Sequence, residues 1–248
     1  MPSIDTYFTA DEHLGHLNII KLCSRPFELS RVGLETMKET ILLNHNMRVS
    51  KGGTTYHIGD MFWRTMPEDE AVEYMKVLNG THHFYWGNHD ELMKKSARLR
   101  GMFATVGDIG NLNKTEISPK LVLLHYAMRV WHNSHNGSWH LYGHSHGALP
   151  DGGNLSMDVG VDTHRFMPYS LAEIAEIMKA KKLKGHEDPI AKEIRERPWD
   201  KAEGAQKPKT VMVQGVEFPL LQPPQELFNA LKLVHEANES LTGGKCIE

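Results

Sequence analysis

The sequence is short of cysteine and has no long apolar run. Its two cysteines, Cys23 and Cys246, lie far apart and show neither a zinc-type nor a redox spacing. No apolar stretch approaches the roughly 20 residues that a membrane-spanning helix needs. The first five residues lack a basic segment followed by an apolar one, which is the pattern of a secretory leader. These absences predict a cytoplasmic protein in a reducing environment, with no membrane partner.

A strong excess of either charge is also absent. The chain has 28 Lys and Arg residues against 31 Asp and Glu residues, a net charge of −3. It therefore has no overall attraction for nucleic acid or an anionic membrane, and any polyanion must be bound locally. The length of 248 residues and the 40% of hydrophobic side chains suffice for one well-buried domain with a small appendage.

Histidine, by contrast, is abundant. The chain has 16 histidines, and the neutral imidazole ring is the commonest metal ligand, with a pKa near physiological pH. A single histidine is more simply interpreted as a solvated or structural residue. A functional interpretation therefore needs several histidines that belong to one pattern.

Hydrophobic periodicity predicts short strands that alternate with helices over residues 1–184. The expected strands are 4–9, 54–58, 82–86, 106–112, 114–117, 121–124, 139–142 and 155–159. One helix is expected to begin near His16, and four others are expected over 30–49, 67–78, 91–99 and 170–182. Strands that alternate with helices, followed by consecutive strands, favour an α/β sandwich of mixed sheets flanked by helices.

Residues 185–248 are predicted to form a C-terminal extension. Residues 185–209 are rich in charge, Pro and Gly, which indicates a linker. Residues 210–213 and 216–220 fit a β-hairpin, and 225–238 have helical spacing. The extension has 8 basic and 11 acidic residues, which does not suit a nucleic-acid clamp because phosphate binding relies on Lys and Arg. We expect it to act as a structural flap or in self-association.

Polar clusters directly follow five of the hydrophobic runs. They are Asp11-Glu12-His13, Gly59-Asp60, Gly87-Asn88-His89-Asp90, His125 and Gly143-His144-Ser145-His146. If the runs are neighbouring strands, their carboxyl ends meet at one edge of the sandwich, where open α/β sheets bind ligands. Residues far apart in the sequence would then line one pocket.

The residue types of these clusters suit a metal site. Carboxylate and amide oxygens and imidazole nitrogens, without cysteine, favour Mn²⁺, Fe or catalytic Zn²⁺ over a structural zinc ion. Asp11 and His13 are two residues apart, and so are His144 and His146. In an extended segment, residues with that spacing point the same way, which permits chelation.

The ordered set of clusters resembles the signature of the calcineurin-like metallophosphoesterases. The elements Asp-x-His, Gly-Asp, Gly-Asn-His-Asp, a His after an apolar strand, and Gly-His-x-His span residues 11–146, and the general likeness extends to about Lys182. Residues 11–20 and 125–131 are also similar to a bacterial and phage branch of that superfamily. The resemblance implies a sandwich of two mixed β-sheets flanked by helices, with residues 1–184 as the catalytic domain.

The resemblance also implies a dinuclear metal centre. Two divalent ions would be bound, with Mn²⁺ as the first choice and Fe or Zn²⁺ as the alternatives. Asp60 would bridge them, which suits two dications that lie about 3.5–4 Å apart and repel each other. One ion would be held by Asp11, His13 and His146, and the other by Asn88, His125 and His144.

Four further residues are candidates for catalysis or substrate binding. His89 is expected to donate a proton to the leaving oxygen. Asp90 would orient the His89 ring, and an equally good alternative is that it caps the helix over 91–99. His16 and Arg129 are the candidate substrate contacts. The alternatives are a helix cap or support of a ligand for His16, and a surface salt bridge or core packing for Arg129.

Together these expectations describe a dinuclear metal-dependent phosphoesterase. It would hydrolyse a phosphodiester or phosphomonoester by direct attack of metal-bound hydroxide, on a small phosphorylated substrate such as a nucleotide. A second hypothesis is a DNA nuclease, because residues 11–15 and 59–62 also resemble SbcD-type repair nucleases. However, Trp63 stands where those nucleases have a functional His. A third hypothesis is a metal-bearing scaffold protein without turnover.

Overall fold

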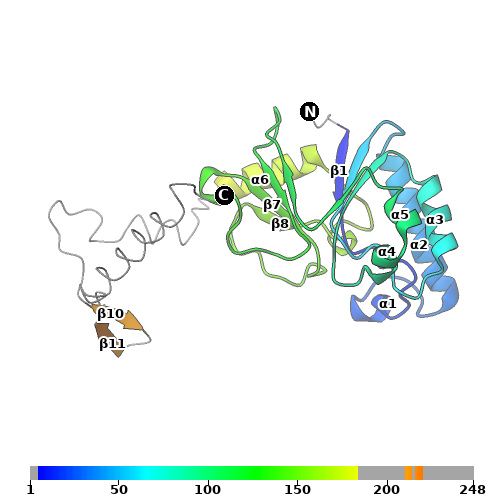
Figure 1. The fold of residues 1–248 in the computed structure, drawn as a ribbon, viewed down its shortest axis with the longest axis horizontal. Helices are drawn as coiled ribbons and strands as arrows, with labels where there is room; N and C mark the ends of the chain where they lie inside the picture. The colour runs from blue at the N-terminus through cyan, green and yellow to red at the C-terminus, as the bar shows by residue number, and fades with distance from the viewer. Residues whose placement is uncertain (1–4, 184–209, 214–215, 220–248) are drawn as a thin grey trace, which may run out of the picture. The chain divides into compact units, whose positions relative to one another are not determined.

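The computed structural model describes residues 5–183, 210–213 and 216–219 (Figure 1). The chain divides into two compact units, Met1–Ala191 and Lys192–Glu248. Every residue of the predicted site belongs to the first unit.

The second unit contains a β-hairpin. Strands β10 (Thr210–Val213) and β11 (Val216–Pro219) pair antiparallel, so the predicted hairpin is present. The predicted linker over 185–209 and the predicted helix over 225–238 lie outside the described residues. The domain boundary after residue 184 and the role of the extension stay predictions.

The first unit has a five-stranded sheet in the order β4-β3-β2-β1-β9. Strands β1 to β4 run parallel, and β9 pairs antiparallel with β1. The bounds are β1 Thr6–Thr9, β2 Thr54–His57, β3 Thr81–Tyr85, β4 Thr105–Gly107 and β9 Tyr169–Ser170. The short β9 strand was not predicted, because two residues are too few to show a period.

A second sheet has four strands in the order β5-β6-β7-β8. Strand β5 pairs antiparallel with β6, and the other pairs are parallel. The bounds are β5 Gly110–Leu112, β6 Leu121–Leu123, β7 Trp139–Tyr142 and β8 Ser156–Asp158. Two mixed sheets confirm the predicted α/β class.

Helices flank both sheets. The α-helices are α1 Ile19–Leu22, α2 Arg31–Arg48, α3 Glu68–Val77, α4 Glu91–Lys95, α5 Ala97–Arg100 and α6 Leu171–Leu183. Figure 1 shows α2, α3 and α5 together on one side of the first sheet, with α6 on the other side of β1. Among the described helices, none is long and apolar enough to cross a membrane.

Two apolar cores hold these layers together, and their side chains alternate along the strands. Phe84 of β3 packs with Met37 of α2 in the core between the first sheet and its helices. The next residue, Tyr85, faces the other core, which also contains Leu141 of β7 and Ile174 of α6. Adjacent strand residues point to opposite faces, so the first sheet is covered on both sides.

Three predicted elements differ from the structure. The predicted strand over 106–112 is two strands, β4 and β5, which belong to different sheets. The predicted helix over 91–99 breaks at Ser96, whose hydroxyl accepts the Leu99 N–H and starts α5. Residues 114–117 form no strand, because Thr115 and Ser118 bond to each other across a turn.

Candidate metal centre

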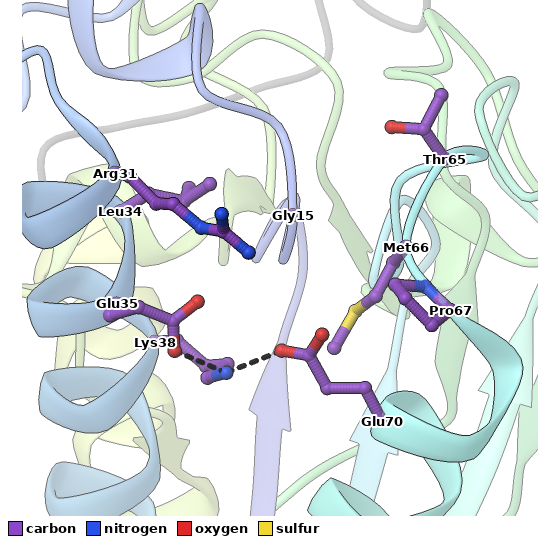
Figure 2. A pocket seen from close by; sticks show the side chains of 9 residues that line it. All are labelled: Gly15, Arg31, Leu34, Glu35, Lys38, Thr65, Met66, Pro67 and Glu70. Carbon is purple, nitrogen blue, oxygen red and sulfur yellow. Dashed lines mark hydrogen bonds and ion pairs between the residues drawn. The ribbon is translucent and has the colours of Figure 1, made fainter.

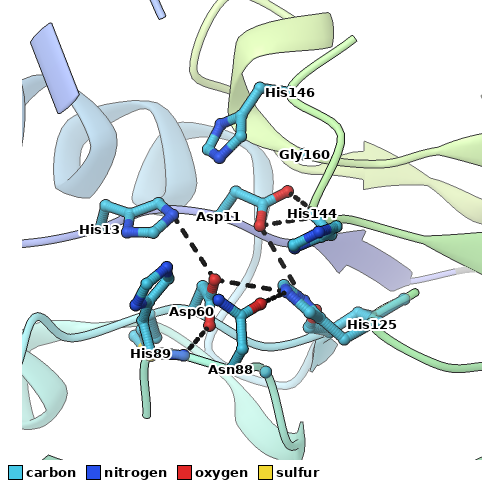
Figure 3. Close-up of polar contacts among 12 residues, drawn as sticks. Asp11, His13, Asp60, Asn88, His89, His125, His144, His146 and Gly160 are labelled. Atoms are coloured by element: carbon cyan, nitrogen blue, oxygen red, sulfur yellow. Dashed lines mark hydrogen bonds and ion pairs between the residues drawn. The ribbon is translucent and has the colours of Figure 1, made fainter. Parts of the chain in front are cut away.

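The predicted ligands meet at one edge of the sandwich, on the loops that follow five strands (Figure 3). Asp11, Asp60 and Asn88 follow β1, β2 and β3 of the first sheet. His125 and His144 follow β6 and β7 of the second. The strand ends that the hydrophobic pattern located therefore converge as parallel strands require.

Strand pairing continues into two of these loops and sets their register. The Asp11 N–H donates to the Gly59 carbonyl oxygen at 3.0 Å, and the His13 N–H donates to the Asp60 carbonyl oxygen at 2.9 Å. The loop after β1 thus runs beside the loop after β2. This backbone contact places the side chains of Asp11 and His13 next to that of Asp60.

Asp11, His13 and His146 form what we call the first ligand group. One donor atom from each lies within 4.8 Å of the others. Asp11 is 0% exposed and His13 is 2% exposed. Both ring nitrogens of His13 lack a hydrogen-bond partner among the described residues. An unpaired buried nitrogen is costly, so this ring fits a bound cation.

Asp60, His125 and His144 form the second ligand group, again with donor atoms within 4.8 Å of one another. The Asn88 side-chain oxygen joins them, 3.0 Å from His125 Nε2. His125 Nδ1 donates to the Ile58 carbonyl oxygen at 2.8 Å, which fixes the ring and leaves Nε2 facing the site. Oxygens of Asp60 and Asn88 thus converge where a cation would be favoured.

Asp60 of the second group also faces the first group. Its Oδ2 is 3.6 Å from His13 Nε2 and 3.3 Å from His125 Nε2. Its Oδ1 accepts the His89 backbone N–H at 2.7 Å. One oxygen therefore faces both groups while the other is tied to the backbone, which is the arrangement that a bridging carboxylate needs.

The backbone is strained at these positions. A positive φ is uncommon for a residue other than glycine and costs of order 1–3 kcal/mol. In the described residues it occurs at nine such positions, and five of them are predicted ligands. The five are Asp11 (60°), His13 (51°), Asp60 (58°), His144 (67°) and His146 (47°). Strain of this kind clusters at functional sites.

Glycines let the loops approach the two carboxylates. A Cβ at Gly87 would lie 2.2 Å from Asp60 Oδ1. A Cβ at Gly143 or Gly160 would lie 2.7 Å from Asp11 Oδ2. Larger residues at these positions would push the carboxylates out of place, so the glycines are part of the site.

Burial and neighbouring charges shift the pKa values of these residues in opposite directions. Burial raises the pKa of Asp11 to about 7. Burial alone would also raise the pKa of Asp60, but His125, together with the His89 N–H and His13, holds the pKa below its usual value. Burial alone would lower the pKa of His125, but the Asp60 carboxylate raises it to about 9. Burial lowers the pKa of His13 to about 3, so this ring is neutral at pH 7 and has a nitrogen lone pair that can coordinate a metal ion.

Arg25 and Asp162 brace the first ligand group, and both were missed in the sequence. The Arg25 side chain donates to the carbonyl oxygens of Asp11 (2.7 Å) and Glu12 (3.0 Å). It also donates to both carboxylate oxygens of Asp162, at 2.7 and 2.8 Å. Asp162 in turn lies 2.7 Å from His146 Nδ1. The clamp therefore links the loop after β1 to the His146 ring.

Glu12 lies between two predicted ligands but belongs to a different cluster. Its Oε1 is 2.8 Å from His57 Nδ1, and His57 Nε2 is 3.1 Å from His82 Nδ1. His45 of α2 lies against both rings. Burial lowers the pKa of His57 to about 3, of His82 to about 2 and of His45 to about 4. These neutral rings form a buried cluster that reaches the loop after β1 through Glu12.

The expected contact between Asp90 and the His89 ring is wrong. The buried Asp90 carboxylate accepts the backbone N–H groups of Asp60, Met61 and Gly87. It makes no capping bond to α4 either. Three amide donors outcompete a neighbouring ring for one carboxylate, so Asp90 holds the loops after β2 and β3 together.

The other candidates divide between the site and the surface. The His89 ring stands 5.6 Å from the His13 ring, at the site. The His16 ring stacks on Trp63, also beside the site, with centroids 3.6 Å apart and planes 3° apart. Arg129 is exposed, and none of the described residues makes a salt bridge with it. Its role in substrate binding stays a prediction.

A separate cavity of about 140 Å³ lies beside the loop after His13 (Figure 2). Lys38 of α2 forms ion pairs there with Glu35 and with Glu70 of α3. The lining residues are Gly15, Arg31, Leu34, Glu35, Lys38, Thr65, Met66, Pro67 and Glu70. They include none of the predicted site residues, and the lysine charge is already balanced by two carboxylates.

Comparisons with known proteins find a protein of similar fold and give no information on activity. No family profile matches the chain. It is 28% identical over 183 residues to the uncharacterized protein MJ1445 of Methanocaldococcus jannaschii, covering 71% of this chain and 93% of that protein. Its fold is similar to that of the protein of unknown function AQ665 from Aquifex aeolicus, with a TM-score of 0.53 and 22% identity, covering 69% of this chain and 98% of that one.

Proposed function

We propose that this protein is a dinuclear metal-dependent phosphoesterase with the fold and site of the calcineurin-like metallophosphoesterases. The observation that supports this most is the position of Asp60, whose Oδ2 faces a ring nitrogen of His13 and one of His125. A single carboxylate between two imidazole-containing groups suits two cations better than one. The unpaired nitrogens of His13 favour the same interpretation.

Asp11, His13 and His146 would hold one ion, and Asn88, His125 and His144 the other, with Asp60 shared. Two divalent ions at such a site supply hydroxide at neutral pH and neutralise phosphate oxygens. Mn²⁺ is the first candidate and Fe or Zn²⁺ are the alternatives, because oxygen and imidazole ligands suit all three.

His89 is the residue we assign to the leaving group. Its backbone N–H is bonded to Asp60, which fixes the residue at the site, while its ring is half-buried and makes no hydrogen bond among the described residues. In the hydrolysis, a water molecule loses one proton to solvent and its oxygen bonds to phosphorus. The bond from phosphorus to the ester oxygen breaks, His89 gives that oxygen a proton, and solvent reprotonates His89. The products are an alcohol and a phosphate with one ester group fewer.

The test uses protein stripped with a chelator and reloaded with Mn²⁺, Fe²⁺ or Zn²⁺. We expect hydrolysis of bis(4-nitrophenyl) phosphate or 4-nitrophenyl phosphate only after reloading. With an alkyl ester, His89→Asn should keep both ions and lose about 10²–10⁴-fold in turnover, the usual contribution of a general acid. Wild-type protein that binds two ions and cleaves no ester would instead be a scaffold, and selective cleavage of DNA would make it a nuclease.

A further inference from the structure

An aromatic pair stands at the leaving-group side of the candidate centre. The Trp63 indole lies 5.0 Å from the His89 ring and 6.1 Å from the His13 ring. Its own plane is set by His16, which stacks on it at 3.6 Å. Trp63 is half-buried, so part of the indole is accessible beside the residue assigned to the leaving oxygen.

The backbone fixes this pair as firmly as it fixes the ligands. The Trp63 N–H donates to the Leu14 carbonyl oxygen at 2.8 Å, and the His16 N–H donates to the His13 carbonyl oxygen at 3.0 Å. Both rings are therefore carried by the two loops that also carry His13 and Asp60. The stack is formed before a substrate arrives, so binding against it needs little further ordering.

We propose that Trp63, backed by His16, contacts a planar organic group on the leaving oxygen and so selects aromatic over aliphatic esters. The inference rests on the proposed function, because His89 places the leaving oxygen and Trp63 is the aromatic ring next to His89. A flat indole gives a planar group more contact than it gives a puckered ring. The exposed Arg64 guanidinium, 5.4 Å from the indole centroid, adds a positive charge that suits an anionic ester.

The experiment compares benzyl phosphate with cyclohexylmethyl phosphate, and their methyl diesters if monoesters are not cleaved. Both leaving groups are primary alkoxides of similar size, and only one is planar. We expect the wild-type protein to prefer the benzyl ester in kcat/KM by at least about fivefold, the lower limit for stacking on an aromatic side chain. Trp63→Leu should bring the ratio close to one, and Trp63→Phe should keep part of it.

Tyr126→Leu is the matched control. Tyr126 is also aromatic and exposed, but it contacts His144 and His125 of the second ligand group. Its loss should leave the ratio of the two esters unchanged. An unchanged ratio in Trp63→Leu, or the same loss of preference in Tyr126→Leu, would overturn the assignment to Trp63.

A binding measurement separates this inference from the proposed function. Benzylphosphonate and cyclohexylmethylphosphonate cannot be hydrolysed at the linking carbon, and their affinity for the reloaded protein is measured by calorimetry. Tighter binding of the benzyl compound, lost in Trp63→Leu, supports the inference even if no ester is cleaved. Ester hydrolysis without a preference for the benzyl compound, in either kcat/KM or affinity, would refute the inference about Trp63 and still support the phosphoesterase proposal.

Discussion

Each ligand group has two buried members, and the groups differ in the third, since His146 of the first is half-buried and His144 of the second is exposed. The first group is also braced from behind, since Arg25 holds its loop and, through Asp162, the His146 ring. Within residues 5–183, no side chain braces the His144 ring in this way, although the His144 backbone N–H is bonded to the Asp11 carboxylate. The two groups are thus alike in their buried members and differ at their third ligand, which is half-buried and braced in the first group and exposed in the second.

The largest effect is expected where the two halves meet. Asp60→Asn removes the charge shared by both groups, so both ions should bind more weakly. Turnover should fall by more than the roughly 10–100-fold typical of residues that only support a ligand. Metal content after dialysis and steady-state kinetics measure this. A variant that still retains two ions would show that Asp60 does not join the groups.

The next largest effect concerns the brace of the first group. Arg25→Ala removes the guanidinium from Asp162 and leaves His146 as its remaining partner, which should cost up to about 3–5 kcal/mol in the free energy of unfolding. The same variant should lose the first ion and keep the second. Urea denaturation and metal titration test both statements.

The control for Arg25→Ala is Arg98→Ala. Arg98 pairs with Asp69 on the surface, and both side chains are exposed. Its loss should cost less than about 1 kcal/mol. Equal destabilisation by the two variants would contradict the view that the first group is held by a buried ion pair.

A smaller effect comes from the buried, neutral histidine cluster next to Glu12. Burial lowers the pKa of His45 to about 4. As the pH falls below 6.5, His45 is therefore protonated in the unfolded chain while it stays neutral in the folded chain. The contribution of His45 to stability is complete above that pH and is lost as the pH falls towards 4, by about 2 kcal/mol between pH 7 and pH 5. His45→Asn should therefore show a shallower loss of stability over this range than wild type, and equal slopes would rule the mechanism out.

The smallest effect on the fold is expected at the exposed ligand of the second group. His144→Ala changes an exposed side chain, so the unfolding free energy without metal should stay within about 0.5 kcal/mol of wild type. The second ion should nevertheless bind more weakly while the first is kept. Metal titrations of His144→Ala and Arg25→Ala would then give opposite patterns, and matching patterns would mean that the two halves are not independent.

All seven predicted ligands could be located from the sequence because each follows a hydrophobic run. Parallel strands bring such positions together by their topology alone, so Asp11 and His125 were placed without knowing a distance. The five-stranded and four-stranded sheets were less predictable. The run over 106–112 gives no sign that the chain leaves one sheet and enters the other, since both halves have the same local pattern.

The brace could not be predicted, for a physical reason. Arg25 follows the short helix α1 and not a hydrophobic strand, so the rule that located the ligands does not apply to it. Its partner Asp162 is 137 residues away. Only the packing of the two sheets brings them together. Asp162 did carry a weak signal, since it follows β8 as the ligands follow their strands. The three amides that bind Asp90 are likewise set by tertiary structure, which is why neighbouring residues suggested the wrong partner.

The left-handed backbone at five ligand positions has a consequence for assembly. An isolated peptide with any one of these loops would rarely adopt the required geometry, because neighbouring loops hold the backbone. Each ligand group also takes residues from loops of both sheets. Ion capture should therefore begin only once both sheets have docked, and a fragment containing one sheet should not bind. Bound ions would then raise the melting temperature by an amount that grows with the logarithm of free ion concentration over Kd, and the rate of metal uptake would report the last step of folding.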